Sequence, residues 1–189
     1  SFLALSKDGL NFDRVIDRPL EPFYMRVFYY SNYMYGVVKG GGLWKSKTGL
    51  DEFELVTNLF NPLMKEEIWH NDPGSVRHVG LYLSKHVLHI FFSRIGDKPE
   101  RILHTSIDLS SSRDQDWLAG KCTEIIRPEE KYEGAEIPLK KSTAGAAHEP
   151  ENALRDPHIM REENSFYLFY SVAGEQGIAL SQFAGIECQ

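Results

Sequence analysis

Features that would place this chain in several well-defined classes are scarce in it. Only two cysteines occur among 189 residues, Cys122 and Cys188, and their spacing is typical of neither a metal site nor a redox pair. The sequence therefore predicts no zinc site and no disulfide framework, and it favours a reducing compartment such as the cytoplasm. No apolar run approaches the ~20 residues that a membrane helix needs, so we expect no membrane partner.

Nothing at the start of the sequence resembles a signal peptide, and concentrated basic charge and helical periodicity are scarce. It opens at Ser1 directly on a strand-like run, as though its true N-terminus were missing, so the native compartment stays open. The formal net charge is -6, and the basic residues are scattered apart from short clusters such as Lys140-Lys141. Nucleic acid is therefore not an expected partner. Helical periodicity is nearly absent, and only residues 59–69 would accommodate a turn or two of helix.

What the chain does contain is a repeated pair of short β-type runs joined by a Gly-rich or Gly-Asp turn. Aromatic and β-branched residues, which favour strands, fill these runs. The pairs are residues 166–171 with 177–181, residues 89–93 with 101–106, and residues 33–38 with 43–46, and a partial copy opens the chain at residues 2–6. Internal repetition of this kind predicts one domain built from similar β units.

The register of the two best copies agrees. Sixteen positions separate Arg77 from Ser93, and 16 separate Arg155 from Ser171. Each unit comprises a strand led by Arg, a central aromatic strand, a third strand ending in Ser, and a fourth strand that contains an aromatic residue. Four short strands per unit, at intervals of roughly 40 to 80 residues, favour a propeller over a sandwich. We predict an all-β fold, a single partial β-propeller over residues 1–189 with about three and a half four-stranded blades.

One segment interrupts this rhythm. Residues 121–153 are rich in Glu and Pro and show no sustained alternation. A long irregular loop inside a compact domain is usually functional or disordered. Because such loops on a propeller gather around the central channel, we expect this one to contribute to a ligand site.

The strand that opens with Arg155-Asp156-Pro157 and its aromatic partner strand resemble the five-bladed propeller glycosidases, the clan of invertases, levansucrases, arabinanases and xylosidases. In that clan, an Asp-Pro pair at the start of an inner strand aims a carboxylate into the axial pocket, and Asp156 matches this position. The clan also carries a Glu-Gly-Pro-like motif whose Glu is the general acid. Glu133-Gly134-Ala135 is similar, with Ala in place of Pro.

The resemblance implies hydrolysis of an oligo- or polysaccharide, which needs one protonated and one ionised carboxyl group on opposite sides of the glycosidic bond. It implies Glu133 as the acid and Asp156 as base, nucleophile or transition-state stabiliser. No metal or organic cofactor is implied. The remaining residues expected to line the axial pocket, by binding hydroxyl groups or tuning charge, are Arg26, Arg77, His78 and Arg155. For His78, a structural role stays equally open.

A competing assignment of the site uses other residues. Residues 69–74, with Asp72 before Pro73, resemble the Asn-Asp-Pro signature of invertases, and Glu187-Cys188 resembles their Glu-Cys motif. The register disfavours this assignment, because Asp72 lies 21 positions before Ser93 whereas Asp156 lies 15 positions before Ser171. Asp-Pro-Gly is also an ordinary turn sequence.

Two further alternatives follow from the incomplete propeller. The chain would be a catalytically inactive carbohydrate-binding or scaffolding propeller if a catalytic carboxylate were missing, because a fold does not fix a function. Open blade edges invite association. We therefore expect either a homo-oligomer formed through these edges or a piece of a longer protein.

Overall fold

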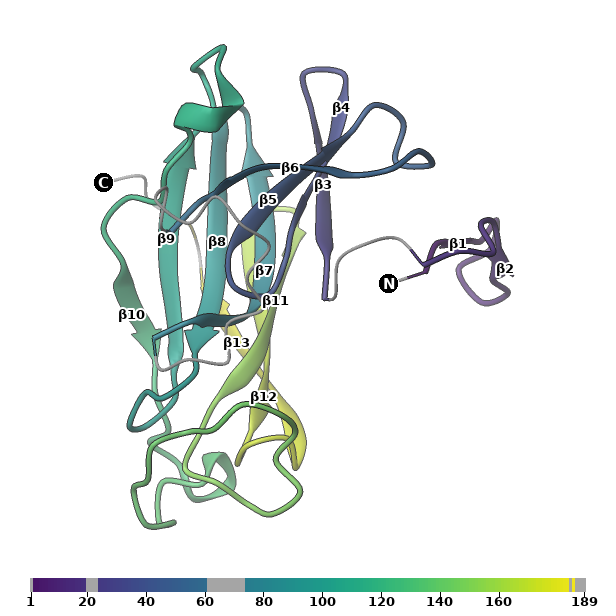
Figure 1. Ribbon diagram of the computed structural model, residues 1–189. Helices are drawn as coiled ribbons and strands as arrows, with labels where there is room; N and C mark the ends of the chain where they lie inside the picture. Colours follow the sequence, from purple (N-terminus) through teal and green to yellow (C-terminus); the bar gives the residue numbers. More distant parts are fainter. Residues whose placement is uncertain (1, 20–23, 61–73, 184, 186–189) are drawn as a thin grey trace.

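The computed structural model describes residues 2–19, 24–60, 74–183 and 185, and in these ranges the chain is all-β (Figure 1). Thirteen strands form four antiparallel sheets, and the helical elements of these ranges are two single-turn 3-10 helices, η1 (Asp114–Asp116) and η2 (Lys131–Glu133). No helix among the described residues is long and apolar enough to cross a membrane.

Two of the sheets have four strands, as expected for propeller blades. The first contains β3 (Arg26–Tyr30), β4 (Tyr33–Val37), β5 (Gly42–Ser46) and β6 (Glu54–Asn58). The second contains β7 (Val76–Ser84), β8 (Val87–Arg94), β9 (Ile102–Asp108) and β10 (Thr123–Ile126). In both, each strand pairs with the next one along the chain, so the sheet is a simple meander.

The other two sheets are incomplete relatives of these blades. One has three strands, β11 (Arg155–Glu162), β12 (Ser165–Val172) and β13 (Gly177–Phe183). The other is a pair of two-residue strands, β1 (Ala4–Leu5) and β2 (Asp13–Arg14), on a lobe that projects from the blades (Figure 1). The predicted all-β, partial propeller is confirmed, whereas the five-bladed count stays a prediction.

The structure corrects one expectation about the segments between the predicted strands and does not describe most of the other. Residues 121–153 are not irregular throughout, because Thr123–Ile126 form β10, which pairs with β9 and completes the second blade. This strand is exposed and short, so it carries little hydrophobic alternation. Most of the expected helical turn falls on residues 61–69, which lie outside the described part of the chain.

Two large apolar clusters of the described core lie one on each side of the second blade, and a smaller third cluster contains Val38, Trp44 and Phe53. Phe92 of β8 packs in one cluster with Phe28 and Tyr35 of the first blade, whereas its neighbour Phe91 packs in another with Leu168 of β12. Adjacent residues of a strand point to opposite faces of the sheet, so an unbroken apolar run such as residues 90–92 fills both layers. This packing holds the three large sheets against one another.

The inner strands β7 and β11 approach so closely that only glycine fits at one position. A Cβ atom on Gly80 would lie 2.6 Å from the carbonyl oxygen of Pro157. We expect Gly80→Ala to lower the free energy of unfolding by about 1–3 kcal/mol, because backbone must shift to admit the methyl group. Urea denaturation measures this change.

A second strand glycine provides the control. A Cβ on Gly177, in β13, would meet only the Val172 side chain at 3.4 Å, an ordinary contact. Gly177→Ala should therefore change the free energy of unfolding by less than about 0.5 kcal/mol. Equal effects of the two substitutions would show that β7 and β11 do not pack as described.

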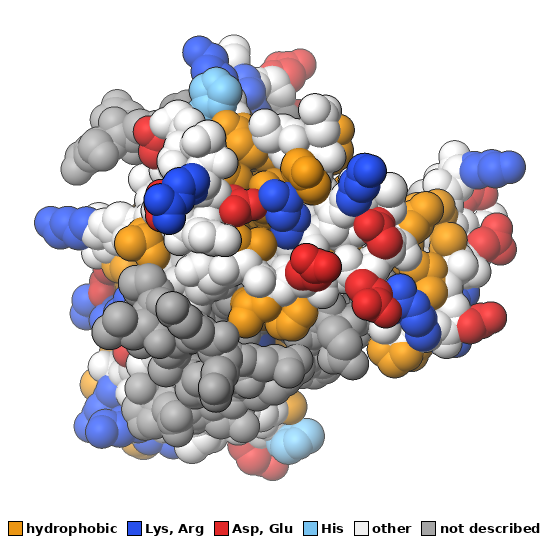
Figure 2. Space-filling view, turned by 45° about the horizontal axis from the view of Figure 1, so that its top comes forward, with side chains coloured by type: hydrophobic (Ala, Val, Ile, Leu, Met, Phe, Trp, Pro, Cys, Tyr) orange, Lys and Arg blue, Asp and Glu red, His pale blue; other side chains and the backbone are white. Residues whose placement is uncertain are grey.

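Exposed apolar side chains lie at both ends of the row of sheets. On β13, the last strand of its sheet, Ile178 is 80% exposed and Leu180 is 52% exposed. On the lobe that carries β1 and β2, Leu10 is 84% exposed, and Figure 2 shows hydrophobic side chains on the surface of this lobe. Large apolar side chains at a sheet edge favour association.

The expected association with a second copy stays a prediction, and these residues allow its test. Light scattering at high concentration should give a mass above that of one chain, and Ile178→Lys combined with Leu180→Lys should return the mass toward one chain. A single-chain mass for the unaltered protein at every concentration would contradict the prediction.

Candidate functional site

The first residues of the three inner strands meet around one cavity. The strand β7 lies beside both β3 and β11, and near the starts of the three strands a cavity of about 170 Å³ opens. Its lining consists of Tyr24, Arg26, His78, Val79, Asp156 and Glu175. Three residues that the sequence predicts for the site, Arg26, His78 and Asp156, are therefore brought together by the fold.

A β-bulge aims Asp156 into this cavity. Arg155 lies opposite Ser171 in the ladder and His158 lies opposite Phe169, so the pairing slips across Asp156 and Pro157. Asp156 has φ of 51°, a backbone conformation that non-glycine residues rarely adopt. Bulges and such conformations are enriched at functional sites because they redirect a side chain.

The second blade repeats this bulge at the equivalent place. The pairing of β7 with β8 slips between Val76 and Val79, which leaves Arg77 and His78 in the bulge. The equal spacing of Arg77–Ser93 and Arg155–Ser171 in the sequence thus has a structural basis. His78 is the counterpart of Asp156, and the two side chains meet in a hydrogen bond between His78 Nδ1 and a carboxylate oxygen of Asp156.

The surroundings of Asp156 favour its ionised form. Burial raises the pKa of this carboxyl, but the hydrogen bond and charge of His78, the Ser171 hydroxyl that donates at 3.0 Å and the charge of Arg155 outweigh it. The pKa of Asp156 therefore lies below its ordinary value. An ionised carboxylate at neutral pH suits the role of base, nucleophile or transition-state stabiliser and does not suit that of proton donor.

The two predicted arginines Arg77 and Arg155 do not line the cavity, so their expected contact with a ligand stays a prediction that this geometry does not favour. Their side chains are almost fully buried and converge on Glu100, which is 0% exposed. Arg77 Nε lies 2.7 Å from one oxygen of Glu100 and Arg155 Nε lies 3.0 Å from the other. A buried guanidinium requires such partners, because an unpaired charge away from water costs several kcal/mol.

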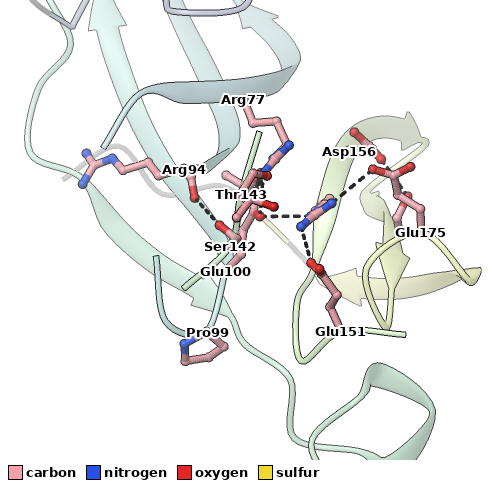
Figure 3. A network of polar contacts seen from close by, with 12 residues as sticks. Arg77, Arg94, Pro99, Glu100, Ser142, Thr143, Glu151, Asp156 and Glu175 are labelled. Atoms are coloured by element: carbon pink, nitrogen blue, oxygen red, sulfur yellow. Dashed lines mark hydrogen bonds and ion pairs between the residues drawn. The ribbon is translucent and has the colours of Figure 1, made fainter. Parts of the chain in front are cut away.

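This network reaches the cavity through a residue that the sequence analysis did not identify. Arg155 also forms ion pairs with Glu151 and, at 3.2 Å, with Glu175. Figure 3 shows Glu175 beside Asp156, at the end of the chain of contacts that starts at Arg77. Arg155 is thus a positioning residue that holds Glu175, the second carboxylate of the cavity lining.

Glu133, the predicted general acid, does not line this cavity. Its carboxylate is buried and accepts hydrogen bonds from the backbone N–H groups of Glu129 and Glu130 and, at 2.9 Å, from the Tyr170 hydroxyl. Because Tyr170 and Ser171 are neighbours on β12 and point to opposite faces, Glu133 and Asp156 contact opposite sides of that strand. The structure does not bring the two expected carboxylates into one cavity.

Two residues of the lining had only weak signals in the sequence. Glu175 is one acid in the turn between β12 and β13, four positions after Ser171, where a solvated turn residue is the ordinary interpretation. Tyr24 precedes β3 and its ring centroid lies 3.9 Å from that of His78. Only the meeting of three blades shows that both residues face Asp156.

A larger cavity, of about 650 Å³, lies between the second blade and β13. Its described lining contains no Asp or Glu, and it consists of Phe91, His104, Ser106, Gly120, Lys121, Thr123, Ile125, Ser181, Phe183 and Gly185. Burial, with a smaller contribution from the charge of His89, lowers the pKa of His104 to about 4, so its imidazole is neutral at pH 7. Lacking a carboxylate, this lining is a weaker candidate than the smaller cavity.

The competing assignment falls outside the described part of the chain. Asp72 belongs to residues 61–73 and Glu187-Cys188 to residues 186–189, and the structure describes neither segment. Their proposed role therefore stays a hypothesis from sequence alone.

Comparisons with known proteins agree with the fold. No known protein-family model matches the chain. The chain is 39% identical over 186 residues to an uncharacterized protein of Acanthamoeba polyphaga mimivirus, which covers 95% of this chain and 51% of that protein. It is similar in structure to an endo-1,4-beta-xylanase from Bacteroides thetaiotaomicron, with 12% identity, a TM-score of 0.52, and coverage of 84% of this chain and 47% of that chain.

Another similar structure is an alpha-L-arabinanase from Cellvibrio cellulosa, with 11% identity, a TM-score of 0.46, and coverage of 89% of this chain and 72% of that chain. The chain spans about half the length of its curated viral relative. At 12% identity, the likeness to the xylanase shows the fold alone. The fold of this chain is that of a glycoside hydrolase-like β-propeller.

Proposed function

We propose that the cavity at the start of β3, β7 and β11 binds a saccharide and that the chain acts as a glycoside hydrolase on an oligo- or polysaccharide. The observation that carries this proposal is Asp156, an ionised carboxylate that a bulge aims into the cavity. In a glycosidase, such a group activates water, attacks the anomeric carbon or stabilises the transition state. The glycoside hydrolase-like fold supports the same function.

The paired carboxylates of the proposal are Asp156 and Glu175, which replaces Glu133 as the second carboxylate because it lines the cavity. Beside them, the ring of Tyr24 offers an apolar surface against which a sugar ring can pack. A cavity of about 170 Å³ is small, which suits a single sugar ring better than a long chain of sugars.

A second candidate is carbohydrate binding without turnover. Two observations favour it: Glu133 does not line the cavity, and both carboxylates of the lining already accept hydrogen bonds from basic side chains. A glycosidase also needs a group that donates a proton to the leaving oxygen. Among the described lining residues, Asp156 has a lowered pKa and Glu175 is paired with Arg155, so neither carboxyl is well suited to donate a proton.

Turnover and binding measured separately distinguish these functions. The protein is incubated with a panel of aryl glycosides and oligosaccharides, and release of aryl alcohol or reducing sugar is followed beside a calorimetric titration. Release of product supports the hydrolase. Saccharide binding without release supports the binding module, and neither binding nor release would contradict both.

A further inference from the structure

We infer that Arg26 gives this cavity a preference for acidic saccharides, those in which a sugar carries a carboxylate. The inference rests on the proposed function, because it assumes that the cavity binds a saccharide. It adds the substrate class, for which neither the fold nor the similar proteins provide a reason. The argument begins with the pairing of charges around the cavity.

Every other ionised group of the lining already has a partner. Asp156 accepts hydrogen bonds from His78 and Ser171, and Glu175 forms an ion pair with Arg155. Within the described residues, by contrast, no hydrogen bond or ion pair involves the guanidinium of Arg26. Among the described residues of the lining, the positive charge that remains available to a ligand is therefore that of Arg26.

The position of Arg26 suits ligand recognition. It is the first residue of β3, its side chain is exposed, and its backbone is fixed by pairing with Val37. The same inner-strand start that places His78 and Asp156 at the cavity also places Arg26 there. Because the backbone of Arg26 is already fixed in the ladder, only its side chain has to be ordered when it contacts a ligand.

Guanidinium groups discriminate between carboxylates and hydroxyl groups. A carboxylate accepts two parallel hydrogen bonds from arginine, and bonds between charged partners are about twice as strong as neutral ones. We therefore expect a saccharide that carries a carboxylate to bind about tenfold more tightly than its neutral counterpart. The net charge of -6 opposes an acidic ligand at long range, but at physiological ionic strength charges farther away than about 8 Å are largely screened. The two carboxylates of the lining are nearer, and each is paired with a basic side chain, Asp156 with His78 and Glu175 with Arg155.

A matched pair of ligands tests the inference. Methyl β-D-glucuronide and methyl β-D-glucoside differ only in a carboxylate where the other has a hydroxymethyl group. Both are titrated into the protein and into Arg26→Gln and Arg26→Lys, with ligand-observed NMR as the readout. Arg113→Gln, which removes one positive charge outside the cavity lining, is the matched control, and thermal melting verifies that each variant is folded.

The inference predicts that the unaltered protein binds the glucuronide about tenfold more tightly than the glucoside. Arg26→Gln should remove this preference, Arg26→Lys should keep part of it, and Arg113→Gln should keep it all. Equal affinities for the two ligands in the unaltered protein would overturn the acidic preference and leave the saccharide pocket intact. Binding of neither ligand, nor of any saccharide of the panel, would overturn both.

Discussion

Asp156→Asn is expected to lower turnover of the best glycoside substrate by about 10³-fold, within the 10²–10⁴-fold range typical of a positioned acid or base. The amide keeps the size of the side chain and is able to accept the Ser171 hydroxyl, so the fold should persist. It carries no negative charge, so it neither activates water nor attacks carbon. Initial rates with aryl glycosides measure the loss of turnover. An unchanged saccharide affinity would show that the loss arises in the chemical step and not in binding.

Glu133→Gln is the matched control, because it neutralises the carboxylate that the sequence predicts as the acid. Glu133 accepts two backbone N–H bonds and the Tyr170 hydroxyl, so the amide leaves at least one of these donors badly paired. We expect the free energy of unfolding to fall by about 1–3 kcal/mol and turnover per folded molecule to stay unchanged. If Glu133→Gln abolished turnover at full stability, the role of general acid would return to Glu133.

Arg155→Met is expected to destabilise the fold by about 3–5 kcal/mol, the cost typical of breaking a buried ion pair by removing one partner. Arg155 joins Glu100, Glu151 and Glu175, and Glu100 is fully buried, so the substitution leaves carboxylates without a counter-charge. Methionine retains the apolar volume of the side chain, which separates the loss of charge from the loss of packing. Urea denaturation at pH 7 measures the effect.

An exposed ion pair supplies the comparison. Arg127 pairs with Glu124 at 2.5 Å, but its side chain is 50% exposed. Arg127→Met should therefore cost less than about 1 kcal/mol, because solvent screens the pair. A similar cost for Arg155→Met would show that the network contributes little to stability. Because Arg155 also holds Glu175, the variant should in addition weaken saccharide binding at temperatures where it is folded.

Much of the fold was readable from the sequence because its signals are local. Aromatic runs such as residues 89–93 and 166–171 correspond to β8 and β12, the central strands of their sheets. The 16-residue spacing that aligns the two best copies has a structural basis, because Arg155 lies opposite Ser171 in the ladder. The short strand β10 escaped detection because an exposed outer strand needs no hydrophobic alternation, and its partner β9 supplies the ladder.

The candidate site was readable only in part. Asp156, His78 and Arg26 share a sequence signature, the start of an inner strand, and all three line the cavity. Glu133 carried a motif-like sequence but is used inside its own loop, where it satisfies backbone amides. The sequence predicts that Arg77 and Arg155 bind a ligand, but in the structure both guanidinium groups form ion pairs with the buried carboxylate of Glu100.

The sequence by itself determined most of the strands, their order and the residues that begin the inner strands, because these depend on hydrophobic periodicity and turn residues within short windows. The tertiary structure alone decided which charges meet. Glu175 lies beside Asp156 because the packing of neighbouring blades brings their two segments to one cavity. Glu133 lies apart from Asp156 because the two carboxylates contact opposite faces of β12. No local pattern encodes such distances, since they depend on every interface between sheets at once.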